Sequence, residues 1–348
     1  MSMRICLITQ GDPGTPTGGY LYHRRIAERA PQYEVELSFL SFPTWPFPSP
    51  AAAGRSVSRQ ARDADVIVLD SIAASFMWPW VRIVDGTPIV AILHQPPGGI
   101  DHARIRTRIQ AALDRSVYRR AAHVMVASEP LASELVDQGF PPEELTVVPP
   151  GRDVAAPPEE PAPLRKDGGL AFLSVGNWIA RKGLLELLEA FAALPRSIGV
   201  LHLAGDAGRG AYSRRVKERI GRSDLRGRIE VHGLVTRERV AELYAGADVF
   251  VLPSLKEPYG TVYGEAMLFG LPVVGWDAGN LPHLARHGRE GLILPPGDIG
   301  ALREALLSVA TNAGLRHELS ESARERASHL PTWDEVAAFF FGVCRRYE

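Results

Sequence analysis

Two glutamates, Glu257 and Glu265, have seven residues between them in the run Glu257-Pro-Tyr-Gly-Thr-Val-Tyr-Gly-Glu265. Each ionised carboxylate can accept two hydrogen bonds at once, which suits the vicinal hydroxyls of a sugar or a ribose. Gly260 stands at the start of a predicted helix, where it permits close backbone approach and where free N–H groups attract anionic or hydroxyl-rich ligands. Two solvated glutamates around a turn would have the same spacing, so this pattern alone leaves both interpretations open.

A pair of adjacent cations, Arg181 and Lys182, occurs in the run Ser174-Val-Gly-Asn-Trp-Ile-Ala-Arg-Lys-Gly183. The order is strand, glycine turn at Gly176, and two positive charges at a predicted helix start. Cations beside free helix N–H groups favour a phosphate site, and an ordinary charged loop is the alternative. The chain contains no Gly-x-x-x-x-Gly-Lys-Ser/Thr run, which excludes a P-loop.

The elements that must position these residues form two series in which short apolar runs alternate with amphipathic stretches. The predicted strands are residues 4–9, 33–40, 66–69, 89–93, 123–127, 145–148, 170–175, 199–204, 228–231, 248–252, 271–275 and 291–294. Helical patterns cover 19–29, 100–120, 130–138, 183–194, 212–221, 236–245, 261–269, 299–311 and 332–347. Nearly continuous Ile, Val and Leu runs are typical of parallel strands buried on both faces. The sequence therefore predicts an α/β protein with two doubly wound, Rossmann-like domains facing a cleft.

The length and composition agree with two globular domains. The chain has 348 residues, is 45% hydrophobic and 23% charged, and carries a formal net charge of −1, which excludes a disordered chain and a general attraction to nucleic acid. Two cysteines, Cys6 and Cys344, cannot form a disulfide framework and favour a reducing cytosol. No run of about 18 apolar residues or signal peptide is recognised, so we expect a cytoplasmic protein. Residues 149–169 contain six prolines and indicate a linker.

Together these motifs resemble the family 4 (group 1) retaining glycosyltransferases of the GT-B fold. The resemblance rests on the two runs above, on Val231-His-Gly-Leu234, on Ala247-Asp-Val-Phe-Val-Leu-Pro-Ser254, on Gly264-Glu-Ala-Met-Leu-Phe-Gly-Leu-Pro-Val273 and on Glu290-Gly-Leu-Ile-Leu-Pro-Pro-Gly-Asp298. It covers nearly all of the second domain, whereas the first domain matches mainly through its architecture. It implies an acceptor-side domain over 1–150, a linker over 151–169, a nucleotide-sugar domain over 170–330, and a C-terminal helix over 331–348 that packs back toward the first domain.

The resemblance also implies roles for residues of the second domain. Arg181 and Lys182 would hold the donor diphosphate, Glu265 the ribose hydroxyls, and Glu257 the hydroxyls of the donor sugar. The remaining donor-binding positions that it implies are Gly176, His232, Gly233, Leu234, Tyr259, Gly260 and Thr261. The backbone of 232–234 would cradle the base.

In the first domain, the resemblance implies that Gly18 and Gly19 let a loop approach the phosphates and the sugar. His94, which ends a predicted strand, would contact the donor sugar near the reacting carbon, and a strand-capping histidine is the alternative. Asp12 and Tyr20 are weaker candidates on the acceptor side. The catalytic set predicted from the whole sequence is therefore His94, Arg181, Lys182 and Glu257.

The chain departs from the family where many members have Gly-Gly-x-Pro-Glu. Here the run is Ala278-Gly-Asn-Leu-Pro-His283, so His283 replaces the usual glutamate. His283 and His287 are four residues apart and could grip a metal, but no third ligand is evident and the family needs no metal for transfer. We predict no metal site there.

These observations predict a retaining, metal-independent glycosyltransferase without a cofactor, which uses a nucleotide-diphosphate sugar as co-substrate and an unidentified acceptor hydroxyl. The alternatives are a nucleotide-sugar epimerase on the same fold and a non-catalytic sugar-nucleotide binding module. An NAD-dependent oxidoreductase is disfavoured because the dinucleotide fingerprint is missing.

The segment 102–120 combines four arginines with apolar residues at helical spacing. Arg104, Arg106, Arg108 and Arg115 accompany Ile105, Ile109, Ala112 and Leu113. An ordinary surface helix packed by its apolar face is the commoner explanation. Peripheral contact with anionic lipid at the inner face of the membrane is the other.

Overall fold

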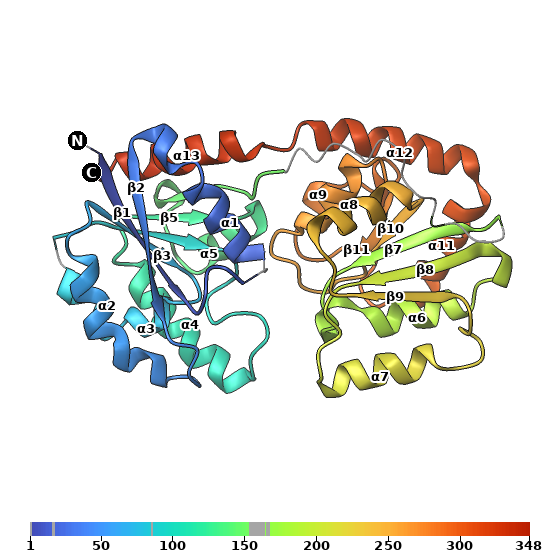
Figure 1. Cartoon of the computed structure of the whole chain (residues 1–348), viewed down its shortest axis with the longest axis horizontal. Helices are drawn as coiled ribbons and strands as arrows, with labels where there is room; N and C mark the ends of the chain where they lie inside the picture. The colour runs from blue at the N-terminus through green and yellow to red at the C-terminus, as the bar shows by residue number, and fades with distance from the viewer. Residues whose placement is uncertain (1, 16–17, 85, 153–163, 165–167) are drawn as a thin grey trace. The chain divides into compact units, whose positions relative to one another are not determined.

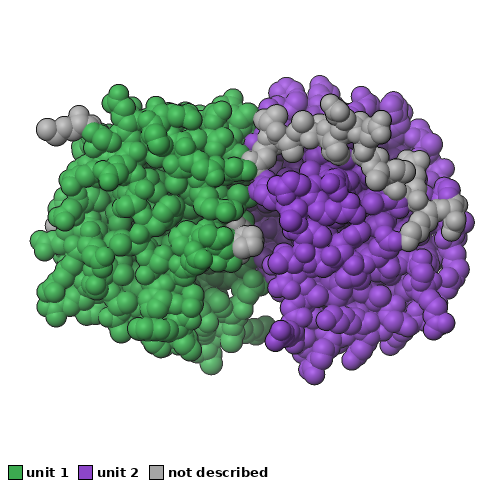
Figure 2. Space-filling view, viewed as in Figure 1, with its two compact units in different colours: residues 1–151, 331–348 green, residues 152–330 purple. Residues whose placement is uncertain are grey.

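The computed structural model describes residues 2–15, 18–84, 86–152, 164 and 168–348. The chain forms two compact units, which Figure 2 distinguishes by colour. Unit 1 comprises residues 1–151 and 331–348, and unit 2 comprises residues 152–330. Most of the predicted linker, at 153–163 and 165–167, lies outside the described residues.

Unit 1 is built on a parallel sheet of six strands within the described part of the chain, in the order β2-β1-β3-β4-β5-β6. The strands are β1 (Met3–Gln10), β2 (Val35–Phe42), β3 (Val66–Asp70), β4 (Ile89–Leu93), β5 (His123–Val126) and β6 (Leu145–Val147). Every residue of β3, β4 and β5 is buried, because helices cover both faces of the sheet. This burial explains the unbroken apolar runs in the sequence.

The helices of unit 1 include the basic segment noted above. They are α1 (Gly18–Ala27), α2 (Gly54–Ala61), α3 (Ala74–Met77), α4 (Arg104–Tyr118), α5 (Glu129–Asp137) and α13 (Trp333–Arg345), with short 3-10 turns at η1 (Ala30–Tyr33), η2 (Ser49–Ala53), η3 (Val81–Val84) and η4 (Pro142–Glu144). In the described ranges, every helix is too short or too polar to serve as a membrane span.

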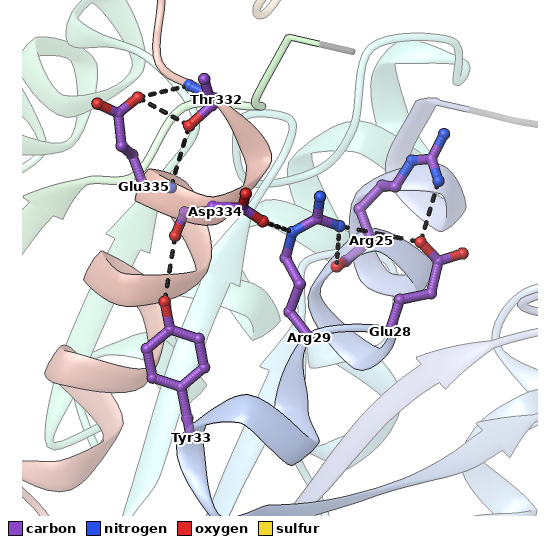
Figure 3. A network of polar contacts seen from close by, with 7 residues as sticks. All are labelled: Arg25, Glu28, Arg29, Tyr33, Thr332, Asp334 and Glu335. Carbon is purple, nitrogen blue, oxygen red and sulfur yellow. Dashed lines mark hydrogen bonds and ion pairs between the residues drawn. The ribbon is translucent and has the colours of Figure 1, made fainter. Parts of the chain in front are cut away.

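The C-terminal helix α13 returns to unit 1, as expected. Its first turn is closed by a capping box between Thr332 and Glu335. Figure 3 shows the polar contacts that hold this end: Arg29 Nε lies 2.6 Å from Asp334 Oδ1, and the hydroxyl of Tyr33 donates to the carbonyl of Asp334 over 3.3 Å. The apolar face of α13 is buried against β1, α1 and their neighbours in one core cluster, so α13 is an integral part of unit 1.

Unit 2 repeats the architecture with a second parallel sheet, again six strands among the described residues, in the order β12-β11-β10-β7-β8-β9. The strands are β7 (Leu170–Val175), β8 (Gly199–Ala204), β9 (Ile229–Gly233), β10 (Val249–Val251), β11 (Val273–Trp276) and β12 (Gly291–Leu294). Strand β10 pairs with β7, although about 75 residues separate them in the chain. The loops that follow these two strands therefore leave the same edge of the sheet side by side.

Helices cover both faces of this sheet (Figure 1). The helices and turns of unit 2 are η5 (Ala180–Lys182), α6 (Leu184–Ala192), η6 (Arg196–Ile198), α7 (Ala211–Ile220), α8 (Arg237–Gly246), α9 (Thr261–Leu268), α10 (Leu281–Leu284), α11 (Ile299–Thr311) and α12 (Ala313–Ser328). Residues of α6, α7 and α11 pack into one core cluster, and residues of α8, α9 and α12 into the other. Each of the two units therefore has the predicted doubly wound, Rossmann-like fold.

Three local expectations differ from the structure. The second strand begins at Val35 rather than at residue 33, because Tyr33 belongs to η1 and Glu34 adopts a left-handed φ of 54°. Helix α12 was not predicted: only three of its residues are buried, so its apolar periodicity is weak. The short helices α2, α3 and α10 were also missed.

The basic helix α4 is buried by a different face from the one its apolar residues predict. Ile105 is 76% exposed and Ile109 is 50% exposed. The buried face instead holds Gln110, Ala111 and Asp114, together with the last turn of the helix. The explanation that this helix packs by its isoleucine stripe is therefore wrong.

Candidate functional site

The loop after β7 carries the two predicted cations on the short turn η5. Gly183 follows them with a φ of +70°, and a Cβ atom at this position would lie 2.1 Å from the carbonyl oxygen of Pro253. Only glycine allows this close contact, which holds Arg181 and Lys182 against the loop after β10. Lys182 is 8% exposed, an unusually low value for a lysine.

Hydrogen bonds join the loops after β7 and β10. The carbonyl oxygen of Arg181 accepts from the amide of Leu255 at 2.8 Å and from Ser254 Oγ at 3.1 Å. In return, Arg181 Nη1 donates to the carbonyl oxygen of Lys256 at 2.7 Å. The Arg181 side chain is thus fixed by backbone groups rather than by a flexible surface contact.

Glu257 meets both cations. Lys182 Nζ forms an ion pair and a hydrogen bond with Glu257 Oε2, and Arg181 Nη1 lies 3.5 Å from the same oxygen. The three side chains are only 10–18% exposed, so their charges interact in surroundings with less water than the surface provides. The sequence predicts that Glu257 binds a sugar and that the cations bind phosphate, and the structure pairs this one carboxylate with both cations.

The backbone around Glu257 is held from the opposite side by residues before α10. The amide of Asn280 donates to the carbonyl oxygen of Glu257 at 2.9 Å, and Asn280 Nδ2 donates to the carbonyl oxygen of Tyr259 at 2.8 Å. Burial raises the pKa of Tyr259 to about 12, so its phenol keeps its proton. Gly260 has a φ of +84° and caps the N-terminus of α9. The run 257–260 is therefore a rigid platform that ends at free helix amides.

Glu265 lies on α9, where it is half-buried. The hydroxyl of Tyr244, from α8, lies 3.2 Å from Glu265 Oε2. Burial is the main reason that the pKa of Tyr244 lies well above its ordinary value, and the charge of Glu265 adds to it. Tyr244 therefore stays protonated and orients the carboxylate of Glu265.

The loops after β8 and β9 complete this edge of the sheet in unit 2. The amide of Gly176 donates to the carbonyl oxygen of Ala204, and the amide of Gly205 to that of Gly233, each at 2.8 Å. His232 is half-buried, with Nε2 3.0 Å from His202 Nδ1. Leu234 is 71% exposed.

In unit 1, His94 follows β4 and lies in a cluster of aromatic and polar side chains. Its ring centroid is 4.7 Å from that of Tyr22 and 5.1 Å from that of His23. Burial, with the nearby charge of His23, lowers the pKa of His94 to about 4, so it is neutral at pH 7. Among the described residues, His94 Nε2 has no hydrogen-bond partner. A Cβ atom on Gly19 would lie 3.9 Å from the His94 ring, so this glycine, near the start of α1, lies next to the histidine.

Sequence reasoning missed the acidic partner in this cluster. Asp70, the last residue of β3, accepts from Thr9 Oγ1 at 2.7 Å and lies 2.9 Å from His23 Nε2. Burial alone would raise its pKa, but the charge and hydrogen bond of His23, the charge of His94 and the hydrogen bond from Thr9 lower it to about 2. An aspartate that ends an otherwise apolar strand is the signal that could have revealed this group.

Two sets of side chains in the described parts of the chain could hold a metal ion: His23, Asp70 and His94 in unit 1, and His202, Glu230 and His232 in unit 2. His283 and His287, the pair weighed as metal ligands in the sequence, belong to neither set, whereas His94 and His232 belong to one each. His287 Nδ1 lies 2.7 Å from the carbonyl oxygen of Ile293. In unit 2, then, the structure brings together Arg181, Lys182 and Glu257, with Glu265 held separately by Tyr244.

Comparison with known protein families matches residues 158–326 to the family described as "Glycosyl transferases group 1". Residues 3–151 match the family described as "Glycosyl transferase 4-like domain". Together these matches cover most of both units.

Two curated relatives illustrate the range of similar sequences. The chain is 32% identical over 213 residues to a D-inositol 3-phosphate glycosyltransferase of Xylanimonas cellulosilytica. The aligned region covers 58% of this chain and 51% of the relative. The chain is also 27% identical over 248 residues to a mannosylfructose-phosphate synthase of Agrobacterium fabrum. This aligned region covers 67% of the chain and 54% of the relative. The aligned regions thus span about half the length of these relatives.

Solved structures extend the likeness over the whole chain. The HepE protein of Anabaena, in complex with UDP and glucose, superposes with a TM-score of 0.81 at 21% identity, covering 99% of this chain and 100% of that protein. A sucrose-phosphate synthase from Thermosynechococcus elongatus superposes with a TM-score of 0.84 at 21% identity, covering 99% and 98%. At this identity the likeness establishes the fold.

Proposed function

This chain belongs to the GT-B group 1 glycosyltransferases, and we propose that it moves a sugar from a nucleotide-diphosphate sugar to an acceptor hydroxyl. The observation that carries this proposal is the cluster of Arg181, Lys182 and Glu257 at the carboxyl edge of the unit 2 sheet. Two nearly buried cations beside a carboxylate match a ligand that joins a diphosphate to a hydroxyl-rich ring. The UDP in the Anabaena structure supports a nucleotide as the carrier.

The cations would bind the diphosphate and offset the negative charge that develops on it as the sugar departs. Arg181 is held in place by the carbonyl oxygen of Lys256, so little reorganisation is needed during the reaction. Lys182 would share its charge between Glu257 and the phosphate, which frees the carboxylate to accept from sugar hydroxyls. Glu265, oriented by Tyr244, would accept from the ribose hydroxyls. Gly176, the backbone of 232–234 and the segment 259–261 would complete the donor site.

We further propose that transfer retains the anomeric configuration. The acceptor oxygen would bond to the anomeric carbon on the face from which the diphosphate leaves. The bond from that carbon to the phosphate oxygen breaks, and the hydroxyl proton passes to the departing phosphate. We propose that this step needs no metal ion, because Arg181 and Lys182 supply the positive charge.

Unit 1 would bind the acceptor. We propose that His94, with Gly18 and Gly19 beside it, contacts the donor sugar. The neutral imidazole of His94 has a buried ring nitrogen without a partner among the described residues, which suits a sugar hydroxyl.

Calorimetric titration with UDP, GDP and ADP tests the donor site. At least one nucleoside diphosphate should bind, and Lys182→Ala should weaken it roughly 10- to 100-fold, the worth of a charge-assisted hydrogen bond. Lys217→Ala removes the same charge from an exposed position on α7 and should bind like the parent. If no nucleotide binds, or if Lys182→Ala binds as tightly as the parent, the proposed site is wrong.

The reaction itself is tested with the donor so identified. NMR of the product should show the donor's anomeric configuration, and transfer should persist in EDTA. An inverted product contradicts retention, and activity that EDTA abolishes and Mg²⁺ restores contradicts metal independence. Isomerised sugar nucleotide formed without any acceptor would identify an epimerase, and tight donor binding without transfer would identify a binding module.

We also propose that α4 contacts anionic lipid. The exposed side chains of Ile105 and Ile109 lie on a helix that also presents Arg104 and Arg108 to solvent. Exposed apolar residues among arginines match a membrane surface of negative charge, where the apolar groups leave water and the cations meet headgroups.

Co-sedimentation with vesicles tests this contact. Vesicles rich in phosphatidylglycerol should bind the protein, and pure phosphatidylcholine vesicles should not. The pairs Ile105→Ser with Ile109→Ser and Arg104→Glu with Arg108→Glu should each abolish binding. Charge reversal of Arg214 and Arg215, which are exposed on α7, is the matched control and should change it much less. Binding that survives both α4 pairs contradicts the proposal.

A further inference from the structure

Strands β8 and β9 place two histidines and a glutamate on one face of the unit 2 sheet. His202 pairs with Glu230 across the two strands, and His232 follows two residues later on β9. Paired residues of neighbouring parallel strands point to the same face, which places His202 beside Glu230. The register shifts between Leu203 and Ala204, so His232 has no paired residue on β8, and the contact of its ring with that of His202 brings it to the other two side chains.

The ligand atoms of these side chains already lie close to the spacing that a metal ion requires. His202 Nδ1 is 3.0 Å from His232 Nε2 and 3.1 Å from Glu230 Oε2. Around a tetrahedral ion with bonds of about 2.0–2.1 Å, neighbouring ligand atoms are roughly 3.3 Å apart. The two pairs that include His202 need to separate by only a few tenths of an ångström, and all three ligand atoms lie within 4.8 Å of one another. The lone pairs would then turn toward a common point.

The surrounding charges and the access route also favour an ion. Of the charged groups that act on His232, Glu230 is negative and Arg239 is positive. The guanidinium of Arg239 is paired with Glu242 at 2.6 Å, which offsets its positive charge. Glu230 is 34% exposed at its side chain, whereas His202 is 1% exposed. The cluster is thus anchored at one end and open to water at the other.

We propose that His202, Glu230 and His232 form a binding site for a divalent transition-metal ion of the zinc class. Two imidazoles and one carboxylate are a common ligand set for such ions, and water would occupy the remaining position. The ion replaces the proton in the hydrogen bond between His202 and His232 and ties the edge strand β9 to β8. This site adjoins the proposed donor site, because the backbone of His232 belongs to the segment proposed to cradle the base, but its ligand side chains are not those proposed to take part in sugar transfer.

The second cluster with suitable residues, at His23, Asp70 and His94, is a poorer candidate. The side chains of His23 and Asp70 are 0% and 3% exposed, so an ion would have to shed all its water to enter. Asp70 is also already engaged by Thr9 and His23. Openness to solvent therefore distinguishes the unit 2 cluster.

The test uses the full chain without a histidine tag, after treatment with a chelator. Calorimetric titration with Zn²⁺ should show one ion per chain, and Co²⁺ should give the intense visible absorption of a low-coordinate site. Removing a partner that only orients a ligand typically weakens metal binding 10- to 100-fold, so His232→Ala should cost about 100-fold or more. Glu230→Gln keeps the side-chain shape and should cost at least about 10-fold.

The matched control is His317→Ala, which removes an exposed histidine from α12. It should bind Zn²⁺ as the parent does, with the same Co²⁺ spectrum. Thermal unfolding of each chelated variant guards against misfolding, and a folded Glu230→Gln variant suffices if His232→Ala does not fold. If Zn²⁺ does not bind, or if it binds the parent and the folded cluster variants equally, the two histidines are only hydrogen-bonded to each other and the proposal is wrong.

Discussion

The buried carboxyl group of Asp114 should make unit 1 less stable as the pH rises. Asp114 lies on α4 and is 1% exposed, and its Oδ2 accepts from the amide of Gly98 at 2.8 Å. Burial raises its pKa from 3.8 to about 7, against the opposing effect of its hydrogen bonds. The folded protein therefore keeps this proton up to about pH 7, whereas the unfolded chain loses it near pH 4.

The magnitude follows from the two pKa values. Between about pH 4 and pH 7 the unfolded state releases a proton that the folded state retains, so the free energy of unfolding falls as the pH rises. The full shift corresponds to roughly 4 kcal/mol, of which roughly 3 kcal/mol accrues between pH 5 and pH 8. Asp114→Asn removes the charge and keeps an oxygen for Gly98. The variant should therefore gain roughly 3 kcal/mol over the parent between these two pH values.

Hydrogen exchange of unit 1 peptides, read by mass spectrometry, reports this unit separately from unit 2. Parent and variant are compared at each pH, which cancels the pH dependence of intrinsic exchange. Asp137→Asn, at an exposed position of α5, is the control and should give a small difference that does not change with pH. A difference for Asp114→Asn that stays constant, or that moves in favour of the parent as the pH rises, would refute the reasoning, because the folded state would then hold an ionised carboxylate at both pH values.

Three further substitutions test the packing around the sites. Gly183→Ala introduces a Cβ atom 2.1 Å from a backbone oxygen at a left-handed φ, and should lower the free energy of unfolding of unit 2 by at least about 2 kcal/mol in urea denaturation. Tyr244→Phe removes the hydroxyl that contacts Glu265. It should lower the free energy of unfolding of unit 2 by about 1 kcal/mol and weaken nucleotide binding in a calorimetric titration. Phe340→Ala should lower the free energy of unfolding of unit 1 by about 3–5 kcal/mol, because this side chain is fully buried. Phe339→Ala, at a position that is 65% exposed, should change it by less than about 0.5 kcal/mol. Similar losses for these two variants in thermal unfolding would contradict the packing of α13 on unit 1.

Local pattern was sufficient for most of the secondary structure. The strand over residues 89–93 and the helix over 299–311 were predicted at their observed bounds, because apolar runs and helical periodicity are properties of neighbouring residues. Helix α12 was missed for the same reason, since few of its residues are buried and its pattern is weak. The family could likewise be recognised from motifs that are continuous in the chain.

Contacts between distant segments were decided by the tertiary structure. Lys182 and Glu257 meet because the sheet order places β10 beside β7, and the order of strands in a sheet is not written in their local sequences. The pairing of Asp70 with His23 depends in the same way on α1 packing over the end of β3. The exposure of Ile105 shows most directly what local sequence does not determine. The sequence determined that α4 is a helix, but the surface against which α4 packs decided which of its faces is buried.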